Sequence, residues 1–322
     1  MAKGQPIVNK ITAALSPASF WVPDYFCLSA WIEHAPFAFW LCETLRPRCF
    51  VELGTHYGYS YFVFCQAIDR LGLGTTAYAI DTWKGDEHAG FYGEDVFQSV
   101  AAHNGQRYSG FSTLIRSTFA EDFGYFEDNT VDLLHVDGRH FYDDVKNDFA
   151  IWRPKLSENA VVLLHDTNVR ERGFGVWKFF DELAAEYPSF EFVHGHGLGI
   201  VAAGQQVPPA LSLVFEASPA TADQVRAAYA ALGNALSVRA AVCERDREIA
   251  ALRATLMQRD RAHADAIRET EAQMIASATI NAGPGGITQR AEALLTTMKT
   301  ARAELSKSWL GREILRVGSN EG

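Results

Sequence analysis

Short apolar runs alternate with helical patterns over roughly the first 200 residues of the chain. Runs rich in β-branched and aromatic residues predict five strands, at residues 49–53, 76–80, 113–116, 131–136 and 160–164. Apolar residues at helical spacing predict helices at residues 35–45, 60–71, 142–152 and 174–187. Residues 190–194 and 198–203 have the pattern of a closing hairpin.

Strands that alternate with helices predict a mostly parallel sheet with helices on both faces. Residues 161–164 are apolar at consecutive positions, as expected for a strand that is covered on both sides. We therefore predict an α/β fold, a doubly wound and mostly parallel seven-stranded sheet. Ligands bind beyond the carboxyl ends of such strands. Here those ends are followed by residues 52–60, Asp81, Ser117, residues 137–140 and residues 165–168.

The pattern changes near residue 205, where Ala, Arg, Glu and Gln begin to dominate. We expect an N-terminal segment (1–34), an α/β domain (35–205), a helical linker (206–237), a coiled coil (238–280) and a C-terminal helix and tail (281–322). Ile249, Leu252 and Leu256 fit a heptad seam, which Arg259 and His263 interrupt, so a solvated single helix is the alternative. Residues 281–286 break the helix, and another is predicted at 289–307.

Composition narrows the function classes. The 322-residue chain has a formal charge of −10, which argues against nucleic-acid binding, because that depends on basic side chains. Its five cysteines are scattered, without a CxxC pair, which suits a reducing compartment. The sequence shows no secretion signal in its first residues and no apolar stretch of the roughly 18 residues that a membrane span needs. We expect a cytoplasmic protein.

The strand at 49–53 runs into a glycine loop, Glu52-Leu-Gly-Thr-His-Tyr-Gly-Tyr-Ser60. Gly54 allows a tight turn and a close approach to a ligand, and the helix that follows offers free N–H groups to a carboxylate. The spacing fits neither a dinucleotide loop nor a Walker A loop. Asp81, at the end of the next strand, can accept hydrogen bonds from two ribose hydroxyls. The alternative is that it only caps the next segment.

Residues 51–60 resemble the first motif of class I S-adenosylmethionine-dependent methyltransferases, especially the catechol O-methyltransferase type. The resemblance implies that residues 35–205 are a methyltransferase domain of Rossmann-like fold. It implies that the loop holds the methionine end of the cofactor, that Asp81 holds the ribose and that Ser117 lies near the adenine. Trp83 is expected either as a wall of the cofactor site or in a core or lid role. The expected cofactor-binding residues are Glu52, Gly54, Thr55, Tyr57, Gly58, Ser60, Asp81, Trp83, Ser117 and Asp137.

Asp137 follows the fourth strand, and His165-Asp166-Thr167-Asn168 follow the fifth. Because neighbouring parallel strands lie about 5 Å apart, these two ends can meet at one ion. Oxygen ligands favour Mg²⁺, whereas a histidine ligand would tolerate Mn²⁺ or another transition metal. The alternative for both aspartates is helix capping.

Residues 132–167 resemble metal-dependent sugar and macrolide-sugar O-methyltransferases and cephalosporin-hydroxylase-like relatives. The resemblance implies Asp137 and Asp166 as metal ligands, with His165 as the third, or with Thr167 or Asn168 in another register. The position of His140 carries a general base in these families, so His140 and Asp137 are the expected catalytic residues; the alternative for His140 is helix capping. His135, in mid-strand, is expected in the core.

Residues 81–93 and 167–176 form the remaining loops at the carboxyl ends of the strands, where ligands are expected to bind. These loops combine flat rings with hydrogen-bond donors, from Trp83, His88, Tyr92, Arg170 and Arg172. This mixture suits a sugar or a sugar phosphate, although the arginines also fit ordinary surface charge. Residues 37–204 resemble methyltransferase domains beside glycosyltransferases of bacterial surface-polysaccharide synthesis.

We therefore expect a metal-assisted O-methyltransferase that acts on a sugar or glycan hydroxyl. Its C-terminal helices would join it to another copy or to a glycosyltransferase. The alternatives are a cephalosporin-hydroxylase-like enzyme, a nicotinamide-binding protein, or a non-catalytic, cofactor-binding scaffold.

Overall fold

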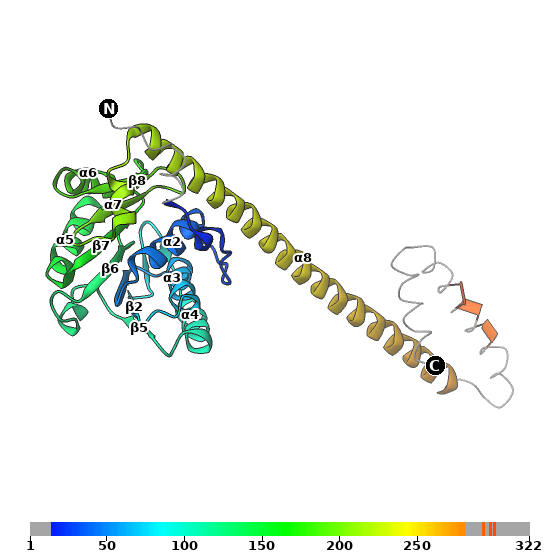
Figure 1. Ribbon diagram of the computed structural model, residues 1–322. Coiled ribbons are helices and arrows are strands. Elements are labelled where there is room, and N and C mark those ends of the chain that lie inside the picture. Colours follow the sequence, from blue (N-terminus) through cyan, green and yellow to red (C-terminus); the bar gives the residue numbers. More distant parts are fainter. Residues whose placement is uncertain (1–13, 281–291, 294–295, 298, 301–322) are drawn as a thin grey trace. The chain divides into compact units, whose positions relative to one another are not determined.

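The computed structural model describes residues 14–280 and, beyond them, 292–293, 296–297 and 299–300. The chain divides into two compact units, residues 1–241 and 242–322. The first contains a seven-stranded sheet with the strand order β5-β2-β1-β6-β7-β9-β8 (Figure 1). The strands are β1 (Cys49–Leu53), β2 (Thr76–Asp81), β5 (Ser112–Arg116), β6 (Val131–Val136), β7 (Leu156–His165), β8 (Ser189–Phe192) and β9 (Leu198–Ala202).

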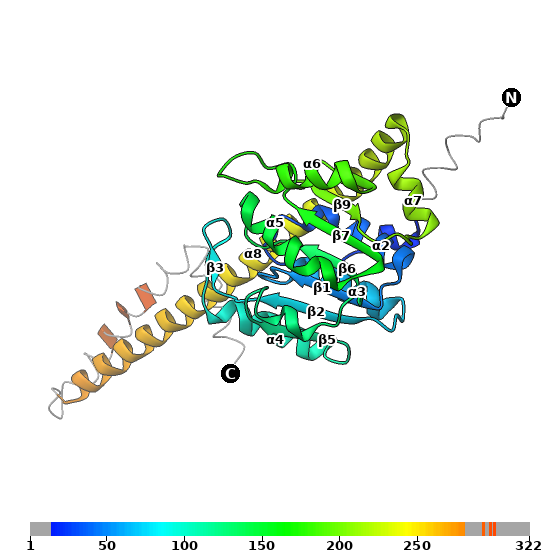
Figure 2. The ribbon, with the colours of Figure 1, turned by 90° about the vertical axis from the view of Figure 1, so that its left-hand side faces the viewer.

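Five strands of the sheet run parallel, from β5 through β2, β1 and β6 to β7, and β9 and β8 close it as an antiparallel hairpin. Figure 2 shows β2, β1, β6 and β7 side by side. The predicted fold class is therefore confirmed. The five predicted strands and the hairpin all form, although β7 begins earlier than predicted, with the polar residues Ser157, Glu158 and Asn159.

Helices cover both faces of this sheet. One face carries α2 (Ala35–Leu45), α3 (Tyr59–Arg70) and α4 (Glu94–Arg107), and the other carries α5 (Tyr142–Trp152) and α6 (Val176–Glu186) (Figure 1). Alternate residues of a strand therefore enter different cores: Phe50 of β1 packs on the first side, and Val51 and Leu53 pack on the second. This explains why the strands are apolar at consecutive positions.

Two features between β2 and β5 were not predicted. The helix α4 buries only Val96, Val100 and Asn104, a stripe too narrow to stand out in the sequence. A short antiparallel ribbon, β3 (Gly85–Asp86) and β4 (Gly90–Phe91), lies within the loop that follows β2.

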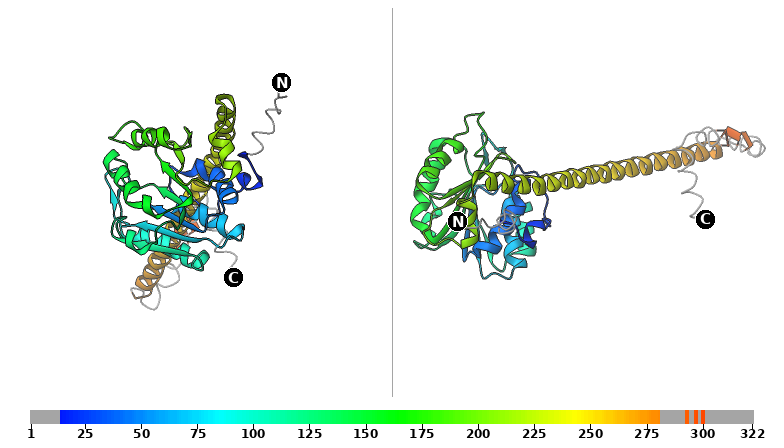
Figure 3. Two further views of the ribbon diagram at one scale, coloured as in Figure 1. Left: turned by 60° about the vertical axis from the view of Figure 1, so that its left-hand side comes forward. Right: turned by 45° about the horizontal axis from the view of Figure 1, so that its top comes forward.

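The predicted linker and coiled-coil segments are joined. After α7 (Pro209–Phe215), the single helix α8 runs from Pro219 to Ile280 without interruption (Figure 3). Its first turns bury Ala222, Val225, Tyr229 and Leu236 in the α/β unit. The heptad seam at Ile249, Leu252 and Leu256 is exposed, and pairing along it stays a prediction.

The predicted breaker at 281–286 lies outside the described residues, as does most of the predicted helix 289–307, whose described positions are helical. Within the described part of the chain, every helix is too short or too polar to cross a membrane.

Candidate functional site

The glycine loop lies at the carboxyl edge of the sheet, with its backbone against the end of β6. Gly54 has a φ of 89°, and a Cβ at this position would lie 2.1 Å from the carbonyl oxygen of Asp137. Only glycine combines this conformation with this close approach. Gly58, with a φ of 83°, precedes α3, and no side chain caps this helix start. The first N–H groups of α3 are therefore suited to a bound carboxylate.

Asp81 ends β2 and holds the glycine loop in place. Its Oδ2 accepts the backbone N–H groups of Thr55 at 2.8 Å and His56 at 2.9 Å, and its Oδ1 accepts that of Trp83 at 2.7 Å. A carboxylate has about four lone-pair sites, so about one remains for another donor. Asp81 thus positions the loop, a role that the sequence did not predict. Its contact with a ribose stays a prediction.

Trp83 is buried beneath this loop. It is 1% exposed, its ring packs against Phe97, and its indole N–H donates to the carbonyl oxygen of His56 at 3.0 Å. Of its expected roles, the core role agrees with this position. Tyr57 is half-buried on the loop, and its carbonyl oxygen accepts the hydroxyl of Tyr25 at 3.0 Å.

Glu52 belongs to a buried network rather than to the surface of the loop. Its Oε2 lies 2.8 Å from Nδ1 of His135, and the indole of Trp31 donates to Nε2 of the same ring at 3.1 Å. Because an indole only donates, Nε2 is the acceptor and Nδ1–H donates to Glu52. Burial raises the pKa of Glu52, and hydrogen bonds from His135 and Ser60 oppose this shift. The expectation that His135 lies in the core is confirmed.

Ser117 follows β5 on an exposed turn. The hydroxyls of Ser117 and Thr118 donate to Glu121 at 3.3 Å and 2.8 Å. These hydrogen bonds order the turn, and a contact with adenine stays a prediction.

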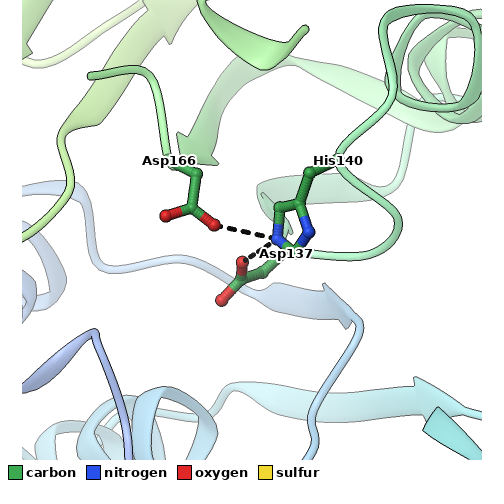
Figure 4. Close-up of side chains that lie close together, drawn as sticks. All are labelled: Asp137, His140 and Asp166. Carbon is green, nitrogen blue, oxygen red and sulfur yellow. Dashed lines mark ion pairs between the residues drawn. The ribbon is translucent and has the colours of Figure 1, made fainter. Parts of the chain in front are cut away.

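Two strand ends meet in a group of acidic and histidine side chains, shown in Figure 4. Nε2 of His140 lies 2.9 Å from Oδ2 of Asp166 and 3.5 Å from Oδ1 of Asp137. The possible ligand atoms of these three residues all lie within 4.8 Å of one another. The ends of β6 and β7 therefore meet as the sequence predicted.

His165 joins the same group. Its Nδ1 lies 3.2 Å from Oδ1 of Asp137 and 3.5 Å from Oδ2 of Asp166, and its Nε2 lies 3.2 Å from the carbonyl oxygen of Gly195. Because all three oxygens are acceptors, both ring nitrogens must donate, and the ring is a cation.

The charges of this group shift the pKa values of its members. Burial lowers the pKa of His140, but hydrogen bonds and charge from Asp137 and Asp166 outweigh it and raise the pKa to about 10. Burial likewise lowers the pKa of His165, but the two carboxylates raise it to about 9. Burial acts to raise the pKa of each aspartate, yet the facing histidines hold both below the usual value. Two protonated rings thus balance two carboxylates where a divalent cation would fit.

The two other candidates for a third ligand, Thr167 and Asn168, have other neighbours. The amide N–H of Asn168 donates to the carbonyl oxygen of Val193 at 2.8 Å. Thr167 is fully buried, and its hydroxyl lies against Gly197 without a hydrogen-bond partner in the described structure.

Sequence reasoning missed the loop between β8 and β9. Nδ1 of His196 lies 3.2 Å from Oδ1 of Asp166, and φ is positive at Gly195 (54°), His196 (69°) and Gly197 (93°). The carbonyl oxygen of Gly195 also lies 2.9 Å from Nε2 of His34. The only signal in the sequence was a histidine between two glycines in a hairpin turn.

The two loops expected to contact a substrate meet beside His140. Nε2 of His88 lies 2.9 Å from the carbonyl oxygen of Arg172, and the guanidinium of Arg172 donates to the carbonyl oxygen of His88 at 2.9 Å. The ring of His140 lies nearly parallel to that of Phe174, with the centroids 4.6 Å apart. His88 also packs against Phe174 and Phe141.

Backbone oxygens engage the arginines of these loops. Arg170 donates to the carbonyl oxygen of Thr167 at 2.6 Å and lies over the ring of Trp177. Arg172 also donates to the carbonyl oxygen of Glu87 at 3.4 Å. Both side chains therefore hold loop structure.

Known proteins resemble parts of this chain. The uncharacterized protein y4gI of Sinorhizobium fredii (strain NBRC 101917 / NGR234) is 53% identical over 212 residues, which cover 66% of this chain and 23% of that protein. The chain thus spans less than a quarter of that relative. Among solved structures, the O-methyltransferase TomG of Streptomyces achromogenes, involved in tomaymycin synthesis and solved with SAM, has 17% identity and a TM-score of 0.42. The match covers 63% of this chain and 91% of that one.

A second structure, the SAH-bound methyltransferase PaMTH1 of Podospora anserina, has 12% identity and a TM-score of 0.41, over 62% of this chain and 98% of its own. The family model described as a methyltransferase domain matches residues 51–167, which run from the glycine loop to the Asp166 strand end.

Proposed function

We propose that the α/β unit is an S-adenosylmethionine-dependent O-methyltransferase, assisted by a divalent metal, that methylates a hydroxyl of a sugar or surface-glycan intermediate. One observation carries the proposal. The glycine loop touches the backbone of Asp137, whose side chain faces His140 and Asp166. A site for a methyl donor thus adjoins a group that can activate an oxygen. The methyltransferase-domain match covers both parts.

Methyl transfer needs alignment of the donor and the acceptor, because the sulfonium of the donor is already activated. The backbone of Gly54 and Gly58 and the start of α3 would hold the methionine end. Asp81 would offer its remaining acceptor site to the ribose while it fixes the loop. Trp83 supports the loop from below.

The side chains at the two strand ends fit a divalent cation. Asp137 and Asp166 supply carboxylate oxygens, and His165 and His140 present ring nitrogens to them. A cation bound here would lower the pKa of a contacting hydroxyl. His140 would then accept the proton, because the carboxylate charges that raise its pKa would be neutralised by the cation.

The acceptor would lie against the loops that carry His88 and Arg172. The rings of His88, Phe141 and Phe174 offer flat faces beside His140. Sugars combine apolar faces with hydroxyls, so this surface suits a sugar ring. The exposed seam of α8 would join a second copy of the chain or a glycosyltransferase.

The test is transfer of a labelled methyl group from S-adenosylmethionine to glycan extracts, with and without a chelator. We expect transfer that the chelator abolishes and added metal restores. Hydroxylation in place of methylation would favour the cephalosporin-hydroxylase-like alternative. Cofactor binding without transfer to any glycan would favour the scaffold.

A further inference from the structure

His165 has the orientation of a metal-ligating histidine. Its Nδ1 faces Asp137 and Asp166, while its Nε2–H donates to the carbonyl oxygen of Gly195 at 3.2 Å. A histidine that binds a metal almost always donates its other N–H to such a group, which fixes the tautomer and the ring orientation. The side chain is only 3% exposed, so its neighbours hold it in this position.

A second histidine fixes the carbonyl group that orients His165. His34 is fully buried, and its Nε2 lies 2.9 Å from the same Gly195 oxygen. That oxygen is an acceptor, so His34 donates to it. The N-terminal segment is thereby connected, through Gly195 and His165, to the carboxylate of Asp137.

The inward-facing atoms of this arrangement are carboxylate oxygens of Asp137 and Asp166 and ring nitrogens of His165 and His140, the second of which is the proposed base. Of the third-ligand candidates that the sequence left open, His165 has a ring nitrogen within 3.5 Å of both carboxylates, whereas the amide N–H of Asn168 donates to Val193. The side chains of Asp137, His165 and Asp166 are 20%, 3% and 7% exposed, which limits the room for water. Mg²⁺ prefers oxygen ligands and usually keeps several waters, whereas imidazole suits transition-metal ions such as Fe²⁺, Ni²⁺, Cu²⁺ and Zn²⁺.

We propose that Asp137, Asp166 and Nδ1 of His165 form a mixed nitrogen–oxygen centre that binds a transition-metal dication in preference to Mg²⁺. His34 is a positioning residue of this centre. The inference deepens the proposed function, since it concerns the metal of the same site. It can nevertheless be tested without cofactor or acceptor, because the ligands come from the protein alone.

The test measures metal binding to the full chain after removal of bound metal, by titration calorimetry with Mg²⁺, Mn²⁺, Co²⁺ and Zn²⁺. We expect one ion per chain, with the transition-metal ions bound roughly 100-fold more tightly than Mg²⁺. Pulsed electron paramagnetic resonance of the Mn²⁺-loaded protein should show coupling to an imidazole ¹⁴N nucleus. This measurement on the unmodified protein does not depend on whether a variant folds.

Substitutions of single histidines show which ring supplies the nitrogen ligand. His165→Gln should remove the ¹⁴N coupling and most of the preference over Mg²⁺, whereas His263→Gln, an exposed histidine on α8, should change neither. His34→Ala should weaken Mn²⁺ binding about 10-fold, in the range of outer-shell substitutions. His34→Gln, whose amide N–H can reach the Gly195 oxygen, should restore it.

Three results would overturn the inference: Mg²⁺ bound as tightly as Mn²⁺, no ¹⁴N coupling, or coupling that His140→Gln removes and His165→Gln leaves. If the protein binds S-adenosylhomocysteine but no metal, this inference fails and the cofactor proposal stands. If it binds a transition metal but no S-adenosylhomocysteine, the metal centre stands and the proposed methyl transfer fails.

Discussion

Substitution of Gly54 by alanine tests how the glycine loop is built. The residue has a φ of 89°, and the added Cβ would lie 2.1 Å from the carbonyl oxygen of Asp137 and 2.9 Å from Cα of Gly138. Both neighbours are backbone atoms, so no side chain can rotate away. The loop or the end of β6 has to move.

Two costs add in this variant. A left-handed conformation costs a residue with a Cβ roughly 1–2 kcal/mol. Forcing atoms into a packed region typically costs about 1–3 kcal/mol more. We therefore expect the free energy of unfolding to fall by about 2–5 kcal/mol.

Two other glycines separate these costs. Gly72 has a φ of 59° with open space around its would-be Cβ, and Gly74 has open space without a left-handed φ. Gly72→Ala should cost only the conformational part, about 1–2 kcal/mol. Gly74→Ala should be neutral or stabilise by up to about 1 kcal/mol, since it restricts the unfolded chain.

Urea unfolding followed by circular dichroism measures the free energy of unfolding of the three variants. Calorimetry with S-adenosylhomocysteine measures their affinity for the cofactor product. Gly54→Ala should be the least stable and should bind this ligand more weakly than the wild type. A Gly54→Ala variant as stable as Gly72→Ala would refute the close approach to β6. If a destabilised Gly54→Ala variant binds the ligand with normal affinity, the loop is not part of the cofactor site.

The other substitutions separate binding from turnover. Asp81→Ala should weaken binding of S-adenosylhomocysteine in calorimetry, because three loop N–H groups lose their acceptor along with any ribose contact; unchanged affinity would argue against both roles. His140→Ala should lower the rate of methyl transfer while cofactor affinity stays near that of the wild type, and a parallel loss of both would show a structural role instead. Stability of the metal-free protein should depend on pH through His140 and His165, whose folded-state pKa values of about 10 and about 9 exceed the ordinary value of about 6.5. Their stabilisation is complete below about pH 6.5 and is lost as the pH rises through the folded values. In the presence of a chelator, the urea concentration at the unfolding midpoint should therefore decrease as the pH is raised from about 7 to about 10. The decrease should be smaller in His140→Gln. A midpoint that does not change with pH would contradict the charged pairs.

Local patterns explain what the sequence could predict. Most residues of the strands β1 and β6 are apolar because both faces are covered, and each strand ends where a glycine or an aspartate follows. The close approach of Asp137 and Asp166 followed from strand order alone, since β6 and β7 are neighbours in a parallel sheet.

Contacts between distant segments could not be predicted in this way. His34, His196 and Asp166 come from three separate parts of the chain, and only the folded β8–β9 turn brings them together. The role of Asp81 in holding the loop depends on backbone N–H groups, which carry no sequence signal. Likewise, the sequence left Arg170 and Arg172 open between substrate contact and ordinary surface charge, and it carried no signal of their backbone partners.

The central claim is that the glycine loop and Asp81 form a binding site for an adenosyl cofactor. Calorimetric titration of the full chain with S-adenosylhomocysteine, with NAD⁺ as the comparison ligand, tests it most directly. We predict saturable binding of one S-adenosylhomocysteine per chain, weakened in Asp81→Ala, and no binding of NAD⁺. Binding of NAD⁺ alone, or of neither ligand, would contradict the account.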